Sequence, residues 1–298
     1  MSPRLLLILS MVSFGTIAPF VRGIALPSGE LALYRAVLAS LLIGGFLLLK
    51  RERIPLRGLG RALPLLILSG AAMGINWILL FEAYRYTTVS VATLSYYFAP
   101  VIVTAVCPIL FRERLGGKEI VCFVMSTVGL VLITGVSALG NSRELIGVLF
   151  GLGAAVFYAS VVLLNKFIRG VEGIHRTFLQ FLAAIAVLLP YVLFSGGFTL
   201  HTLNGAGWGY LLIVGLFHTG VTYCLYFSSL KELPGQTSAI LSYIDPLVAV
   251  IISCTFLQET LTWWQAVGGV LILGFTLWNE IPGGKGKRSN RKKTERES

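Results

Sequence analysis

The feature that most constrains this chain is a series of long stretches with almost no charged residue. Residues 5–21, 31–49 and 236–258 are examples. Charged residues make up 12% of the 298 residues and hydrophobic residues 56%, against about 25% and about 45–50% in soluble domains. So few charged side chains cannot cover a soluble protein of this length. The chain is therefore predicted to be an all-α integral membrane protein made of apolar helical spans.

Runs of about 20 apolar residues, the length that crosses a bilayer, are found ten times. The predicted spans are 5–22, 31–49, 63–83, 90–111, 119–138, 146–166, 177–195, 207–229, 236–257 and 264–280. They leave short loops and a polar tail, 281–298, that we expect to be disordered, with no room for a soluble catalytic domain. Arg4 before the first run suggests a signal peptide, but no convincing cleavage site follows, so we expect that span to be retained.

Lysine and arginine lie almost entirely on one side of this topology. Ten spans place both termini on the same side, which holds 20 of the 24 Lys and Arg, whereas the other side holds Arg22, Arg85 and Arg143. Cytoplasmic loops carry such an excess, so we predict an inner (plasma) membrane protein with both termini in the cytoplasm. The net charge of +11 then belongs to loops and to the run 285–293, which suits anionic lipid head groups rather than nucleic acid.

The sequence repeats itself at an offset of 146 residues. Residues 83–115 align with 229–261 without a gap. The matched pairs are Tyr97 with Tyr243, Pro100 with Pro246, Glu113 with Glu259 and Leu115 with Leu261. Each half carries five predicted spans, an odd number, so residues 1–143 and 144–280 are predicted to be inverted repeats.

Both halves contain the pattern P-x12-E-x-L, in the stretches YYFAPVIVTAVCPILFRERL and SYIDPLVAVIISCTFLQETL. Together with the two five-span halves, Phe14-Gly15 and Tyr34-Arg35, this pattern resembles the EamA-type members of the drug/metabolite transporter superfamily. The resemblance implies carriage of small metabolites by alternating access, commonly the export of amino acids or related compounds. No motif specifies the substrate.

Asp245 falls near the middle of the ninth span, at the predicted midplane of the bilayer. A carboxylate there is costly unless it is hydrated, paired or protonated, so it should face the interior of the bundle. Ser242 lies one turn earlier on the same face, whereas the repeat equivalent of Asp245 is Ala99. Three roles are open for the carboxylate: a counter-charge for a substrate amine, an acceptor of coupling protons, or a neutral group bonded to a neighbouring helix.

Other polar and aromatic side chains within spans are further candidates for a substrate site. Arg35, one turn inside the second span, either snorkels to the surface or attracts an anionic substrate group. His218 either makes a helix–helix hydrogen bond or acts as a protonatable switch. Thr222 lies one turn beyond His218, and Asn76 is its repeat equivalent. The tyrosines that could stack on a substrate, or merely pack the bundle, are Tyr96, Tyr97 and Tyr243.

Pro100 and Pro246 fall near the middle of their spans. Each lacks a backbone N–H and should free the carbonyl four residues earlier, at Tyr96 and Ser242. The pair either makes simple packing kinks or forms hinges that line a cavity.

The sequence contains no nucleotide-binding loop, dinucleotide fingerprint or HExxH motif, and its cysteines lack zinc or disulfide spacing. We therefore expect no cofactor or metal, and no ATP-driven pump within this chain. An ion channel and an intramembrane enzyme are weaker alternatives, because neither repeated filter segments nor a nucleophile–base set is found. Glu82 is expected to pair with Arg85, and Glu113 and Glu259 to order the loops at the ends of their spans.

The charge asymmetry makes a testable prediction about topology. A reporter that fluoresces only in the cytoplasm should be bright when fused to the C-terminus or placed in the loop 167–176, and dark in the loop 138–146. Whole-cell fluorescence, normalised to expression by blotting, checks this. A bright reporter in the loop 138–146 would contradict the ten-span topology.

Overall fold

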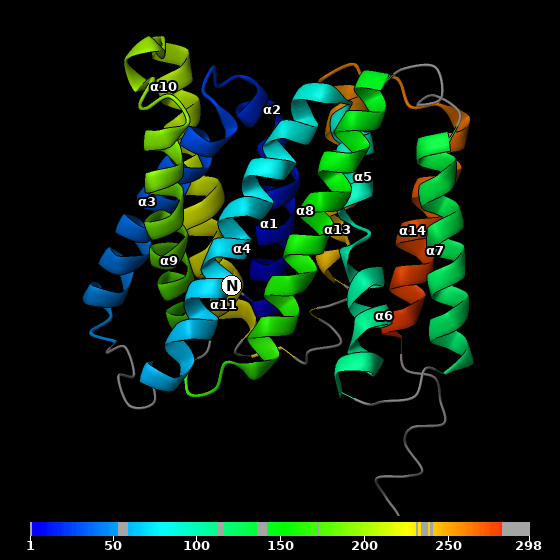
Figure 1. Cartoon of the computed structure of the whole chain (residues 1–298), viewed down its shortest axis with the longest axis horizontal. Coiled ribbons are helices and arrows are strands. Elements are labelled where there is room, and N and C mark those ends of the chain that lie inside the picture. Colours follow the sequence, from blue (N-terminus) through cyan, green and yellow to red (C-terminus); the bar gives the residue numbers. More distant parts are fainter. Residues whose placement is uncertain are drawn as a thin grey trace, which may run out of the picture.

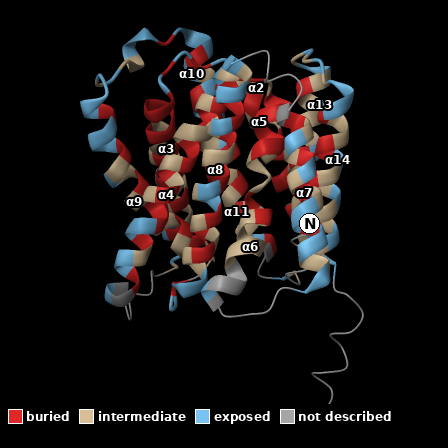
Figure 2. Ribbon diagram, turned by 45° about the vertical axis from the view of Figure 1, so that its right-hand side comes forward, coloured by how far each residue is buried: buried red, intermediate tan, exposed pale blue. Residues whose placement is uncertain are grey.

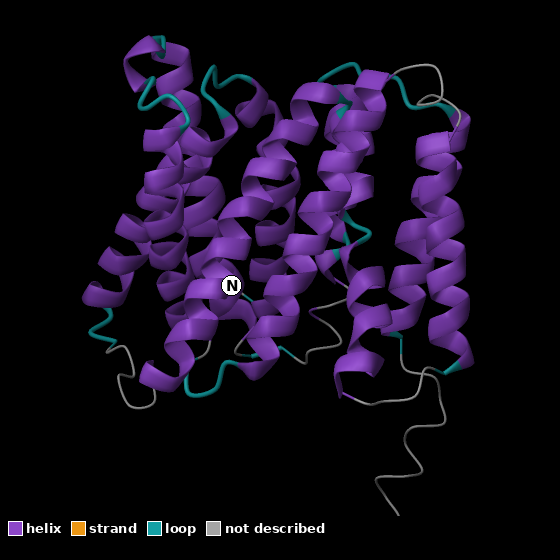
Figure 3. Cartoon of the chain, in the orientation of Figure 1, coloured by secondary structure: helices purple, strands orange, loops and turns teal. Residues whose placement is uncertain are grey.

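A computed structural model gives the structure of this chain over residues 2–52, 59–111, 116–135, 142–171, 173–230, 232–233, 238 and 241–281. Within these ranges all regular structure is helical and no strand is present (Figure 3), which confirms the all-α class. Glu113 and the basic tail, to which the sequence analysis gave roles, lie outside the described ranges.

The helices run side by side along one direction and form a bundle (Figure 1). Up to residue 135 they are α1 (Pro3–Gly15), α2 (Ile17–Arg22), α3 (Ser28–Leu49), α4 (Leu59–Tyr86), α5 (Val89–Tyr96), α6 (Ala99–Phe111) and α7 (Gly117–Gly135). From residue 142 they are α8 (Ser142–Phe167), α9 (Gly173–Phe194), η1 (Leu200–Thr202), α10 (Gly205–Leu212), η2 (Ile213–Val221), α11 (Thr222–Leu230), α13 (Ile244–Thr255) and α14 (Trp263–Glu280). The beginning of α1 and the end of α14 lie at the same end of the bundle. We call the opposite end, which carries the loop 23–27, the distal end.

The surface of the bundle is that of a membrane protein. Seven helical segments of the described chain are long and apolar enough to cross a membrane: Pro3–Arg22, Ser28–Leu49, Ala62–Tyr86, Val89–Val106, Ser142–Phe167, Gly173–Phe194 and Gly205–Ser229. Large apolar side chains such as Leu49 (87% exposed) and Phe194 (91% exposed) project outward, where acyl chains can solvate them. Buried residues gather on the helix faces that meet inside the bundle (Figure 2). Because α7, α13 and α14 are not among the seven segments, the count of ten spans stays a prediction.

The packing of the helices relates the two halves of the chain to each other. Helix α4 packs against α8 and α9, and the predicted repeat equivalents of these pairs, α11 with α1 and η2 with α3, are also in contact. Two further contacts join elements to their own equivalents: α3 with α9, and α7 with α14. Halves related by a two-fold axis would pack in this way. The pattern supports the inverted repeat, which remains a prediction.

The two proline-containing spans are broken, not merely kinked. Helix α5 ends at Tyr96 and α6 begins at Ala99, and Tyr243 forms a turn before α13. Pro100 and Pro246 therefore lie in the first turn of a new helix, where a backbone N–H has no partner within the helix anyway. The regular helical pattern is thus interrupted directly before each proline. Whether the two sites act as packing kinks or as hinges stays a prediction.

A π-helical segment, which the sequence analysis did not predict, interrupts the eighth predicted span. Segment η2 continues α10 and leads directly into α11. Hydroxyl groups reinforce its wide turns: Thr219 Oγ1 donates to Val214 O at 2.8 Å, and Thr222 Oγ1 donates to Phe217 O at 2.9 Å. Such segments are uncommon and frequently lie at functional sites.

Helices α7 and α14 approach each other closely through a pair of glycines. A Cβ atom on Gly129 would lie 2.6 Å from Gly268 O, and a Cβ on Gly268 would meet Gly129 O and the side chain of Ile133. A Cβ on Gly274, in the same helix, would meet nothing within 4 Å.

This contact makes a prediction about stability. Gly268→Ala should lower the free energy of unfolding by about 1–3 kcal/mol, because the added methyl group forces the two backbones apart. Gly274→Ala should not lower it, since the methyl group enters open space. Thermal unfolding of both variants in the same detergent checks this. Equal destabilisation of the two would contradict the close contact.

Candidate functional site

Asp245 lies at the break in the second of the two broken spans. Its side chain is in the first turn of α13, where the partial positive charge of a helix N-terminus favours an anion. The hydroxyl of Tyr97, at the break in the other span, donates to Asp245 Oδ2 at 2.5 Å. The two predicted site residues therefore meet directly, and their bond joins the two halves of the chain. Both side chains are only partly buried.

Small and aromatic residues surround this pair. A Cβ on Gly15 would lie 2.6 Å from Asp245 O, so the glycine allows α1 to approach the start of α13. Tyr96 contacts Tyr97 edge to face, with ring centroids 5.7 Å apart. Its other neighbour is Tyr158 of α8, with centroids 5.4 Å apart. The carboxylate thus sits next to several aromatic rings that carry hydroxyl groups.

Arg35 is buried inside the bundle and does not reach the surface. It is 6% exposed, its Nε donates to Thr219 Oγ1 at 2.7 Å, and its guanidinium lies 4.6 Å from the centre of the Trp77 ring. Phe81 contributes a second ring at 5.6 Å. The interpretation in which Arg35 snorkels to the surface is wrong, because these groups hold the guanidinium within the bundle. The other interpretation, attraction of an anionic substrate group, stays a prediction.

The two buried charges do not neutralise each other. Within the described chain, Arg35 and Asp245 form no ion pair. The bundle therefore holds a basic and an acidic side chain, Arg35 and Asp245, each of them bonded to a hydroxyl group.

The remaining predicted site residues make contacts between helices. His218 Nε2 lies 3.2 Å from Thr16 Oγ1 of the α1–α2 junction, and Thr222 Oγ1 lies 2.7 Å from Ser13 Oγ. Asn76 donates to Ala154 O of α8 at 2.7 Å. The structure therefore gives each of these three side chains the interhelical role that was one reading of His218. Tyr243 is buried at the break, and Ser242, partly buried, lies directly before it.

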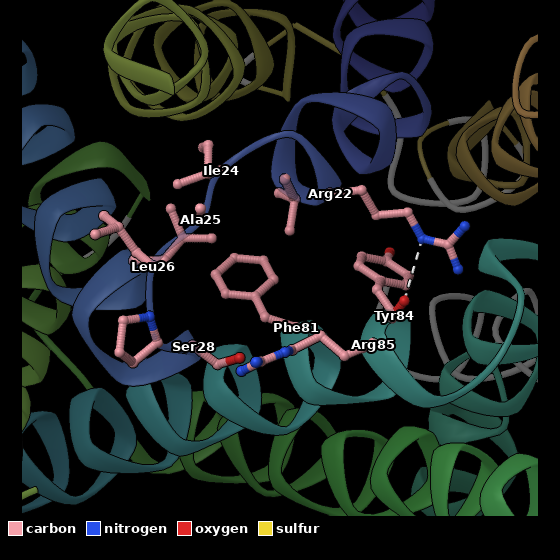
Figure 4. Close-up of a pocket in the computed structure, with 11 residues that line it drawn as sticks. Arg22, Ile24, Ala25, Leu26, Ser28, Phe81, Tyr84 and Arg85 are labelled. Carbon is pink, nitrogen blue, oxygen red and sulfur yellow. Dashed lines mark hydrogen bonds between the residues drawn. The ribbon is translucent and has the colours of Figure 1, made fainter. Parts of the chain in front are cut away.

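A cavity of about 660 Å³ lies at the distal end, between α2, the loop 23–27, α3 and α4 (Figure 4). Most of its wall is apolar, and Arg22, Ser28 and Arg85 add polar groups. Phe81 and Tyr84 also line it. Phe81 therefore both lines the cavity and lies 5.6 Å from the Arg35 guanidinium, measured to the centre of its ring.

A polar clamp that the sequence analysis missed joins the halves at the distal end. Arg22 forms an ion pair with Glu259 and donates to the backbone carbonyls of Tyr84 and Thr87 at 3.1 and 2.6 Å. Glu259 Oε2 also accepts from Val89 N at 2.8 Å, at the start of α5. We call Arg22 and Glu259 with these contacts the distal clamp. Arg22 had counted only as a loop charge, whereas Glu259 was expected to order its loop.

The exposed ion pair predicted between Glu82 and Arg85 is present, with a separation of 3.2 Å. It lies close to the distal clamp in the chain but differs in burial. Arg85 is 60% and Glu82 21% exposed, whereas Arg22 is 30% and Glu259 10% exposed.

A comparison with known protein families and proteins gives independent evidence on this chain. The model of the EamA-like transporter family matches residues 1–135 and again residues 145–279. The chain belongs to the EamA-like transporter family. The family and the names of its relatives indicate a transporter and not an enzyme.

Relatives of this EamA-family transporter come from bacteria and archaea. The "Uncharacterized transporter YxxF" of Bacillus subtilis is 30% identical over 268 residues, which cover 89% of this chain and 85% of the relative. An "Uncharacterized transporter" of Archaeoglobus fulgidus is 30% identical over 281 residues, covering 92% and 95%. "Protein PecM" of Dickeya dadantii is 28% identical over 245 residues, covering 80% of each chain. A solved crystal structure shares the fold, with a TM-score of 0.61, 16% identity and coverage of 92% and 93%.

The difference in burial between the two ion pairs makes a prediction. Glu259→Gln should lower the free energy of unfolding by about 1–3 kcal/mol, because Arg22 loses its anionic partner. Glu82→Gln should change it by less than about 1 kcal/mol, since exposed pairs contribute little. Thermal unfolding in detergent compares the two matched variants. If Glu82→Gln were the more harmful, the distal clamp would not hold this end of the bundle together.

Proposed function

We propose that this EamA-family protein is a secondary transporter that exports amino acids or related compounds by alternating access, with its substrate site around Asp245. The observation that carries the proposal is the bond between Tyr97 and Asp245, made where two spans are broken. In many secondary transporters, discontinuous helices from two repeats form the substrate site near the middle of the membrane.

The carboxylate of Asp245 has the chemistry to bind an ammonium group. Tyr97 occupies Oδ2, whereas Oδ1 has no hydrogen-bond partner among the described residues and is not fully buried. A substrate amine could therefore bond Oδ1 while the tyrosine and the helix N-terminus hold the carboxylate in place. The same free oxygen could instead accept a coupling proton.

The other features supply the parts that alternating access requires. The distal clamp would hold this end of the bundle closed, and its ion pair would separate when the end opens. The breaks before Pro100 and Pro246 would be the hinges, because the regular pattern of helical hydrogen bonds is interrupted there and the dihedral angles can change. On this proposal the protein lies in the plasma membrane with both termini in the cytoplasm, and its basic tail contacts anionic lipid head groups.

Replacing one carboxylate oxygen tests the role of Asp245. Asp245→Asn keeps the size of the side chain, so the protein should fold. If the carboxylate holds a substrate amine, binding should weaken by about 10- to 150-fold, which corresponds to the loss of one charge-assisted hydrogen bond. If it carries a proton instead, binding should persist while flux driven by a pH gradient is lost.

The measurements are equilibrium binding of an amino-acid panel to purified protein and flux into liposomes with and without a pH gradient. Glu144→Gln, which removes a carboxylate at the start of α8, serves as the matched control and should behave as wild type. Unchanged binding and unchanged pH-dependent flux in Asp245→Asn would remove Asp245 from the mechanism. Ohmic, unsaturable flux through the wild-type protein would favour a channel.

A further inference from the structure

Arg35 is a buried cation whose hydrogen-bonding capacity is largely unused. It is 6% exposed, yet the one hydrogen bond that it makes within the described chain joins Nε to Thr219. Neither Nη atom has an acceptor among the described residues. A guanidinium group in the interior of a membrane protein is expensive to desolvate. Its four remaining N–H donors are therefore available to an acceptor on a ligand.

The structure holds the guanidinium in one orientation. The hydroxyl of Thr219 donates its only hydrogen to Val214 O, so its oxygen is left to accept from Arg35 Nε. The π-helical turn of η2 makes this bond possible. A Cβ on Gly215 would lie 2.5 Å from Leu38 Cδ1, so the glycine lets η2 approach α3. With Trp77 on its face and Thr219 on its Nε edge, the guanidinium leaves its Nη edge open.

We propose that the Nη edge of Arg35 binds the carboxylate of the transported molecule. A guanidinium group and a carboxylate match in shape and form two parallel hydrogen bonds. The inference rests on the proposed function in one respect, namely that the carboxylate belongs to the molecule that Asp245 binds. The proposal requires that one ligand reach from Arg35 to Asp245.

The two charges together define the class of ligand. A molecule with one carboxylate and one ammonium group neutralises Arg35 and Asp245 at once, as an amino-acid zwitterion does. A phosphate ester carries up to two negative charges and would be repelled by Asp245. A polyamine would leave Arg35 without an anionic partner, and its ammonium groups would be repelled by the guanidinium. Arg35 and Asp245 together therefore favour amino acids over phosphate esters and over polyamines.

A simple carboxylate tests Arg35 without knowledge of the substrate. Sodium acetate should raise the unfolding midpoint of the purified wild-type protein in a saturable manner relative to sodium chloride at equal ionic strength, because a ligand that binds the folded state stabilises it. Arg35→Gln should lose this difference entirely. Arg35→Lys should lose most of it, since an ammonium group keeps the charge but cannot form the two parallel bonds.

Arg4→Gln, which removes an exposed arginine from the start of α1, is the matched control and should keep the full acetate effect. Asp245→Asn should keep the acetate effect or strengthen it, because the negative charge that opposes an anion is removed. This separates the inference from the proposed function: if no amino acid is transported but the acetate effect depends on Arg35, only the proposed function fails. If Arg35→Gln does not fold, the comparison of the acetate effect in Arg35→Lys and in the wild type still tests the proposal. Equal midpoints in acetate and chloride for the wild type, or an acetate effect that persists in Arg35→Lys at full size, would overturn the proposal.

Discussion

The rest of the structure depends on how the bundle accommodates two opposite charges in its interior without pairing them. In lipid an unpaired charge is costly, and a direct ion pair would be the simplest remedy. The chain instead gives each charge a neutral partner: Thr219 and Trp77 hold Arg35, and Tyr97 with the start of α13 holds Asp245. Each charge is thereby supported on one side and left open on the other. Such an interior is poorly suited to pure packing and well suited to a polar ligand.

The departures of the backbone from α-helical geometry lie beside these charges. Residues 97–98 and Tyr243 interrupt helices next to Asp245, and η2 places Thr219 against Arg35. Non-helical backbone at membrane depth is tolerated only where protein or water can satisfy its polar groups. The irregular segments and the two buried polar groups are therefore parts of one arrangement. Membership of the EamA-like transporter family shows that the chain is a transporter.

Hydropathy predicted the helical membrane fold, because a chain in lipid must form its backbone hydrogen bonds internally and few structures do so. The repeated motif predicted the family. They also marked Asp245 and Tyr97, but not their bond, which joins residues 148 positions apart across the two halves. Arg35 had two readings from its depth alone, and only the contact with Trp77 decides between them. No residue in the sequence marks the π-helical turns of η2 in the way that a proline marks the break of a helix. The ion pair between Arg22 and Glu259 could not be predicted, because a count of charges does not show which loops contact each other in the fold.

The central claim is that Arg35 and Asp245 are the two ends of one substrate site. Equilibrium binding to the wild-type protein tests it most directly, with the tightest-binding amino acid of a panel compared with its carboxamide, which lacks the carboxylate, and with its des-amino acid, which lacks the amine. The account predicts that each derivative binds about 10- to 150-fold more weakly than the parent amino acid, because each leaves one buried charge without its partner. A derivative that binds as tightly as the amino acid would contradict it.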